Sequence, residues 1–138
     1  MRSEDIMMGD WVRLRYKHWG TNEEVVKDFK VSQIRKAWDG NELDAWCSES
    51  GNMGKVSRLE PIPITSEILE KNGFSTTKKF RTYYYHQSGV YISVGMWGRI
   101  TVSSEGNRFG NRMNIDCQYV HELQHALRLC GITKEIIV

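Results

Sequence analysis

The 138-residue sequence is poor in cysteine, in net charge and in long apolar runs. Its three cysteines, Cys47, Cys117 and Cys130, are widely spaced and form no C-x-x-C pair, so neither a disulfide framework nor a thiolate zinc site is predicted. No apolar stretch approaches the roughly 20 residues that a membrane-spanning helix needs, and the charged N-terminus lacks the apolar core of a signal peptide. We therefore expect a soluble cytoplasmic protein with reduced thiols and no membrane partner.

The charge balance is close to neutral, with 19 Lys and Arg against 17 Asp and Glu and a formal net charge of +2. A dedicated nucleic-acid binder is usually far more basic. Hydrophobic residues make up 40% and charged residues 26% of the chain, which is typical of a folded globular protein. Five tryptophans, six tyrosines and four phenylalanines supply bulky side chains for a core or for a binding face.

The first half of the sequence shows the period-two alternation of short strands. Trp11 to Tyr16 is the clearest example, and three further candidates follow: Phe29 to Ile34, Leu43 to Cys47 and Lys55 to Leu59. Several short strands within about sixty residues are typical of a small barrel. The opening sequence GDWVRL is also similar to the first strand of SH3-like barrels. We expect residues 1–63 to form an SH3-like β-barrel lobe.

The second half begins with a short helix and ends with a longer one. Thr65 is a suitable N-cap for a helix over Ser66 to Lys71, which Asn72-Gly73 should end. Four strand candidates follow, separated by glycine-containing segments: Phe80 to His86, Val90 to Met96, Arg99 to Ser103 and Arg112 to Asp116. A helix from about Tyr119 to Cys130 and a short strand or tail complete the chain. Residues 64–138 should form an α+β lobe in which the C-terminal helix packs on an antiparallel sheet, making the whole chain α+β and mainly β.

The string His121-Glu122-Leu123-Gln124-His125 has the spacing of zinc peptidases. Two histidines four residues apart on a helix share one metal ion in those enzymes, and the glutamate activates the bound water. The same residues give the alternative hypothesis of a zinc-dependent hydrolase, with His121 and His125 as ligands and Glu122 as base.

Two observations count against this hypothesis. At about 100° per residue, both histidines lie opposite the apolar stripe of the helix, so we expect them on the solvent face. The stripe consists of Val120, Leu123, Ala126, Leu127 and Cys130. A catalytic zinc also needs a third protein ligand, and only Glu135 follows as a candidate. We therefore predict no metal, no cofactor and no catalytic residue.

Three segments resemble a group of small uncharacterised proteins encoded by Bacteroidetes and their prophages or mobile elements. They are the opening MRSEDIMMGDWVRL, the segment RLEPIPITSEILEKNGF (Arg58 to Phe74) and the segment YVHELQHALRLCGI (Tyr119 to Ile132). The group commonly has asparagine at the place of His125 and often glutamine at that of Glu122. Because neither residue would preserve a metallopeptidase, the resemblance implies shared architecture and no catalytic site.

Basic residues at two places suggest a second alternative, a weak nucleic-acid-binding module. Arg13, Arg15 and Lys17 share one face of the first predicted strand and lie close to aromatic residues. Lys78, Lys79 and Arg81 precede a run of three tyrosines. Cations that neutralise phosphates beside aromatic rings that stack on bases are typical of single-strand binding. A solvated strand face explains the same pattern, since charges discourage edge pairing.

The leading hypothesis is a non-enzymatic interaction or accessory module of a phage or mobile element. It would bind a protein partner through exposed aromatic and basic strand faces.

Overall fold

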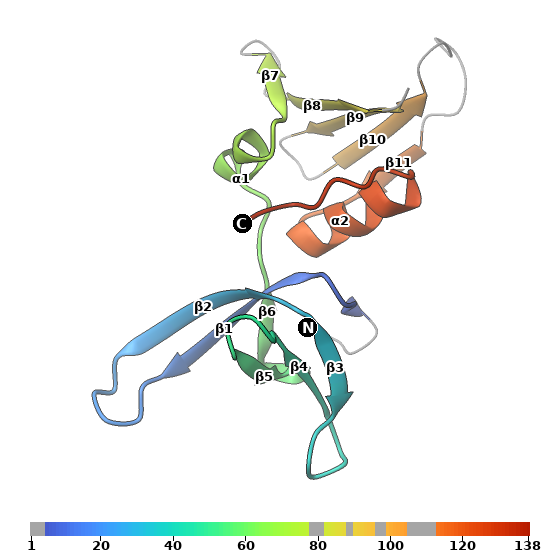
Figure 1. Ribbon diagram of the computed structural model, residues 1–138. Coiled ribbons are helices and arrows are strands. Elements are labelled where there is room, and N and C mark those ends of the chain that lie inside the picture. The colour runs from blue at the N-terminus through green and yellow to red at the C-terminus, as the bar shows by residue number, and fades with distance from the viewer. Residues whose placement is uncertain (1–4, 78–81, 88–89, 96–98, 105–112) are drawn as a thin grey trace. The chain divides into compact units, whose positions relative to one another are not determined.

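The computed structural model describes residues 5–77, 82–87, 90–95, 99–104 and 113–138 (Figure 1). The chain forms two compact units, an N-terminal unit (Met1–Ile62) and a C-terminal unit (Pro63–Val138). Both are built mainly from antiparallel strands, so the expected α+β, mainly β class is confirmed. Among the described residues no helix is long and apolar enough to cross a membrane.

The N-terminal unit consists of two three-stranded antiparallel sheets. In the first sheet the order is β2-β1-β6, and in the second it is β3-β4-β5. The strands are β1 (Trp11–Lys17), β2 (Glu24–Lys30), β3 (Gln33–Lys36), β4 (Leu43–Trp46), β5 (Met53–Lys55) and β6 (Leu59–Pro61), with a 3-10 turn, η2 (Val56–Arg58), between the last two.

The core of this unit contains buried side chains from both sheets. Val12 on β1 pairs with Phe29 on β2 and with Pro61 on β6, and both Val12 and Phe29 are buried. The second sheet contributes Ala45 from β4. Such burial of alternate apolar side chains supplies most of the free energy that holds two small sheets together.

Two expected strands of this unit are wrong. Phe29 to Ile34 is not one strand, because the chain changes sheets in its middle. Val31 donates its backbone N–H to Asp10 at 2.8 Å beside the first sheet, whereas Ser32 donates to Trp46 of the second sheet at 2.8 Å. Lys55 to Leu59 is mostly the turn η2, which likewise leads from one sheet to the other.

The expected closed barrel is not found among the described strands. No ladder joins β2 to β3 or β5 to β6, so the two sheets stay open. The reason is the same change of hydrogen-bonding partner at Val31-Ser32 and at η2, where the chain leaves one sheet for the other.

The C-terminal unit combines a five-stranded antiparallel sheet with two helices (Figure 1). The sheet has the order β11-β10-β9-β8-β7. Its strands are β7 (Ser75–Thr77), β8 (Thr82–Gln87), β9 (Val90–Gly95), β10 (Arg99–Ser104) and β11 (Met113–Asp116). Of the strands described in this sheet, β7 was the one that we did not expect, because its three residues, Ser-Thr-Thr, have no apolar alternation.

Helix α1 (Ser66–Lys71) has the bounds that its sequence predicts. The Thr65 hydroxyl accepts a hydrogen bond from the Ile68 N–H at 3.3 Å, which satisfies one of the free donors of the first turn. Gly73 then adopts a φ of +76°, a left-handed conformation that favours glycine and ends the helix. The prediction of this helix is confirmed.

Helix α2 (Val120–Leu129) buries the apolar stripe that its periodicity predicts. Val120, Leu123 and Leu127 are fully buried and Ala126 is nearly so, whereas Cys130, the C-cap residue, is only half-buried. Gly131, with a φ of +72°, follows the helix. The chain then turns back, and residues 132–138 run in extended form past α2 toward α1 (Figure 1).

Candidate functional site

Glu122, the residue expected to act as base in a zinc hydrolase, caps helix α2. Its Oε2 accepts hydrogen bonds from the backbone N–H groups of Gln118 at 2.7 Å and Tyr119 at 3.1 Å. A glutamate at the third helical position that reaches back to the N-cap backbone is one half of a capping box. The carboxylate of Glu122 therefore has a structural partner on the main chain.

The two histidines of α2 differ in their surroundings. His121 is 5% exposed, and its ring stacks on that of Tyr119 with 5.9 Å between the centroids. His125 is half-buried and meets His121 edge-on, also at 5.9 Å. The expectation that both lie on the solvent face is wrong, because Tyr119 packs over a flank that the apolar stripe does not include.

This geometry does not assemble a zinc site. No group of three or more His, Cys, Asp or Glu side chains that could hold a metal ion occurs in the part of the chain that the structure describes. The carboxylate of Glu122 is turned to the start of its own helix rather than to the space between the imidazoles. Within the motif, Glu122 caps the helix and His121 packs against the ring of Tyr119.

A cavity of about 610 Å³ lies in the C-terminal unit beside α1, β8 and β9. Cys117 lines it, and burial raises the pKa of this thiol to about 12. A thiol with such a pKa has almost no thiolate at neutral pH and is a poor nucleophile. The Thr65 hydroxyl in the same lining is the N-cap of α1, and the Tyr83 hydroxyl donates to Glu70 at 3.3 Å. Neither Cys117 nor Thr65 is therefore an activated nucleophile in the described lining of the cavity.

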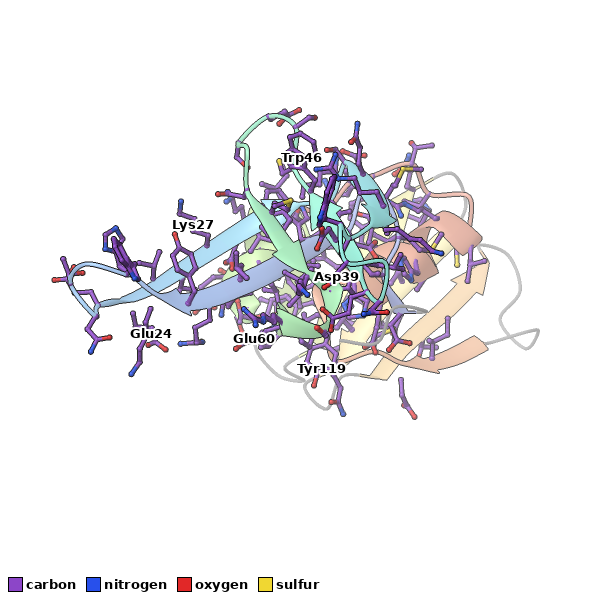
Figure 2. All side chains as sticks on the ribbon, turned by 90° about the horizontal axis from the view of Figure 1, so that it is seen from below. Glu24, Lys27, Asp39, Trp46, Glu60 and Tyr119 are labelled. Atoms are coloured by element: carbon purple, nitrogen blue, oxygen red, sulfur yellow. The ribbon has the colours of Figure 1, made fainter. Side chains whose placement is uncertain are left out.

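The basic residues of β1 are paired with carboxylates of the flanking strands. Arg13 binds Asp28 on β2 in bidentate fashion, with both N···O distances at 2.7 Å. Arg15 lies 3.3 Å from Glu24 on β2 and 3.4 Å from Glu60 on β6, the two strands on either side of β1 (Figure 2). These partners raise the pKa of both guanidinium groups, in each case first through a side-chain hydrogen bond.

The remaining basic candidates do not change this result. Lys17 stands opposite Glu24 in the strand register. Lys78, Lys79 and Arg81 lie outside the described residues. A strand whose arginines are already neutralised by carboxylates has little charge left for phosphates.

A groove of about 490 Å³ opens in the N-terminal unit between β1 and the second sheet. Leu14 and Tyr16 come from β1, Trp38 from the turn between β3 and β4, and Met53 from β5. Gly54 keeps the groove open at its base, since a Cβ at this position would lie 3.0 Å from a methyl group of Leu14. The short strands and tight turns thus bring four large side chains from three elements to one depression.

The aromatic side chains of this groove are unusually accessible. The relative exposure of Trp38 is 104%, and that of Tyr16 is 39%. Met53 is also exposed, at 50%. Exposed tryptophan and tyrosine are enriched at protein interfaces, where a partner covers their large apolar surfaces. Sequence reasoning could not choose Trp38 among the five tryptophans, because what distinguishes it is its position beside a groove.

The charged groups of the groove are mostly compensated. Lys55 lies 2.9 Å from Asp39 and 2.8 Å from Glu42, and hydrogen bonds to this ammonium hold the pKa of both carboxylates below their usual range. Arg58 is exposed in the same lining and forms no ion pair with any residue that the structure describes. The described lining of the groove therefore combines apolar side chains with the exposed cation of Arg58 and with the half-buried carboxylate of Asp44.

Two further residues have a clear role that their sequence context did not indicate. Asn72 and Gln124 are each 3% exposed, and their side-chain amides bind the backbone of residues 134–137. The sequence carries no signature for this role, because each partner is remote along the chain. Ile137 lies 65 residues after Asn72, and Lys134 lies 10 residues after Gln124.

Comparisons with protein-family models, with curated proteins and with solved structures find no match to this chain.

Proposed function

We propose that the N-terminal unit is a protein-binding module whose groove holds an extended segment of another protein. The observation that carries this proposal is the full exposure of Trp38 at the mouth of a groove that also contains Tyr16. Leaving a tryptophan of this size in water costs the protein the free energy that its burial would provide. A partner that covers Trp38 recovers that free energy on binding.

The composition of the groove defines the chemistry of the partner. Grooves lined by aromatic side chains bind extended segments, often with proline or other apolar residues that lie flat on the rings. Arg58 adds a cation that a carboxylate of the segment can meet. We therefore propose an extended, apolar segment that carries at least one acidic residue.

The proposal includes an SH3-like architecture for the N-terminal unit. Two small sheets joined by η2, with an aromatic groove beside β1, support an SH3-like architecture for the N-terminal unit although the sheets are not closed. The resemblance to proteins of prophages and mobile elements supports an accessory role in such an element. Three free cysteines accord with a cytoplasmic location.

Neither alternative function is favoured by a specific contact. The zinc hydrolase lacks a base, because Glu122 is engaged by the backbone of Gln118 and Tyr119. The nucleic-acid module is less well supported on β1, because carboxylates of the flanking strands pair with Arg13 and Arg15 and leave Lys17 as the exposed cation of this strand that has no such pair among the described residues. The groove has no such competing interaction at Trp38.

A selection experiment with a matched control tests the proposal. The full chain is immobilised, peptides are selected from a displayed random library, and their affinities are measured for the wild type, Trp38→Ser and Trp19→Ser. Trp19 is the control because it is equally exposed, at 102% against 104% for Trp38, and lies outside the groove. Loss of a central aromatic contact of about 2 kcal/mol lowers affinity roughly thirtyfold.

We expect this loss for Trp38→Ser and an unchanged affinity for Trp19→Ser. Both side chains are exposed, so neither substitution should affect folding. Selected peptides whose binding is insensitive to Trp38→Ser, or a library that yields no binder, would refute the proposal.

A further inference from the structure

The segment Lys134–Val138 of the C-terminal unit is held by two buried side-chain amides. Gln124 of α2 donates from Nε2 to the Lys134 carbonyl at 3.0 Å, and its Oε1 accepts from the Ile136 N–H at 2.7 Å. Asn72, the C-cap residue of α1, donates from Nδ2 to the Ile137 carbonyl at 2.7 Å and accepts from the Ile137 N–H at 2.9 Å.

These contacts reproduce the hydrogen bonding of a central β-strand. In an extended chain the N–H and C=O groups of successive residues point to opposite sides. The Lys134 carbonyl and the Ile136 N–H therefore face one side, where Gln124 lies, and both groups of Ile137 face the other, where Asn72 lies. The two amides stand in for neighbouring strands, and the segment runs past α2 toward α1 (Figure 1); we call the place between Asn72 and Gln124 the channel.

The side chains of the segment alternate as a strand's do. Ile136 is buried, at 1% exposure, whereas Ile137 is exposed, at 54%. Lys134 extends to the side, with its ammonium 5.4 Å from the centre of the Tyr85 ring. Recognition thus rests on the backbone and on one aliphatic side chain, the combination by which proteins bind extended segments.

We infer that this channel is a binding site for an extended segment in general, and that a second copy of the chain can supply the segment. The segment is known to fit, because the chain's own copy occupies the site. Ile132 is buried and donates its N–H to the Leu127 carbonyl at 2.9 Å, so the segment would separate from the rest of the unit at the exposed Thr133. Exchange of such an element between identical chains is the route by which domain-swapped dimers arise.

The covalently attached segment has the advantage of a high effective concentration, on the order of mM for a short linker. The second copy therefore competes only when the attached segment is weakened.

This condition suggests a test by complementation. One variant carries Asn72→Asp and Gln124→Glu, which place carboxylate oxygens opposite the carbonyl oxygens of Ile137 and Lys134 and so spoil the channel. The other carries Ile136→Asp, which spoils the segment and leaves the channel intact.

Each variant alone should be monomeric, because it lacks either a working channel or a working segment. Mixed at about 100 µM each, they should form a 1:1 dimer by analytical ultracentrifugation, with at least tenfold more dimer than either variant alone. The control mixture uses the channel variant with Ile136→Asp added, which has no working segment and should give no dimer. Ile137→Asp, a matched change at the exposed neighbour, should behave as the wild type.

The result is decisive even if Ile136→Asp does not fold by itself. In that case the channel variant should restore the circular dichroism spectrum of its partner through the supplied segment. Absence of both dimer and restored folding would overturn the inference. The N-terminal groove takes no part in this experiment, so its outcome is independent of the proposed function.

Discussion

Replacement of Glu122 by alanine removes the carboxylate that caps helix α2. One oxygen of this side chain accepts hydrogen bonds from the backbone N–H groups of Gln118 and Tyr119, at 2.7 and 3.1 Å. Loss of a helix cap costs about 0.5 to 2 kcal/mol, and loss of a negative charge in the first turn costs about 0.3 to 1 kcal/mol more. We expect the free energy of unfolding to fall by about 1.5 to 2 kcal/mol. For a unit of this size, Tm should decrease by about 6 to 16 °C.

Differential scanning calorimetry and urea denaturation followed by circular dichroism measure this loss. Glu122→Gln is the matched control, because it keeps an acceptor oxygen at the same place and removes only the charge, so it should lose less than about 1 kcal/mol. If Glu122 were instead a catalytic base without a capping role, both variants would be as stable as the wild type and both would lack hydrolytic activity. An alanine variant that unfolds at the wild-type temperature would refute the capping role.

Three further outcomes are expected. The pKa values of Asp39 and Glu42 lie below their ordinary 3.8 and 4.5 because each accepts a hydrogen bond from Lys55. Their stabilising effect is therefore present above about pH 4.5 and is lost as pH falls through the lowered pKa values. The urea midpoint of Lys55→Met should accordingly lie below that of the wild type at neutral pH, and the difference should shrink as the pH is lowered into the acid range. Gly54→Ala places a Cβ 3.0 and 3.1 Å from two leucine methyl groups and should destabilise by about 1 kcal/mol, measured by the same denaturation; an unchanged midpoint would contradict the tight packing. Cys117, buried and with its pKa raised to about 12, should react with a disulfide reagent at pH 8 only after urea unfolds the protein, and rapid labelling of the native thiol would contradict its burial.

The parts of the fold that depend on neighbouring residues were predictable from the sequence. Helix α1 begins after Thr65 and ends at Asn72-Gly73, because a hydroxyl that caps the first turn and a glycine at positive φ act within a few residues. The stripe of Val120 and Leu127 on α2 was predictable for the same reason, since a helix fixes the side on which each residue lies.

The errors occur where contacts that the period of apolar residues does not show decide the outcome. Residues 29–34 alternate like one strand, yet the chain changes sheets between Val31 and Ser32, because each residue pairs with a different strand. The periodicity of α2 placed His121 in solvent, but it is only 5% exposed, because Tyr119 stacks on it. A helical wheel assumes one packed face and cannot show which other segments cover the remaining surface.

The sequence by itself determined the class of fold and, to within one residue, the ends of both helices, because these follow from local backbone preferences and from the period of apolar residues. Only the tertiary structure decided which polar residues are available for function. In the folded chain Arg13 is paired with Asp28, the Glu122 carboxylate accepts hydrogen bonds at the start of its own helix, and Trp38 is exposed beside a groove. Each of these results depends on a neighbour or on an exposed surface that the order of residues along the chain does not specify.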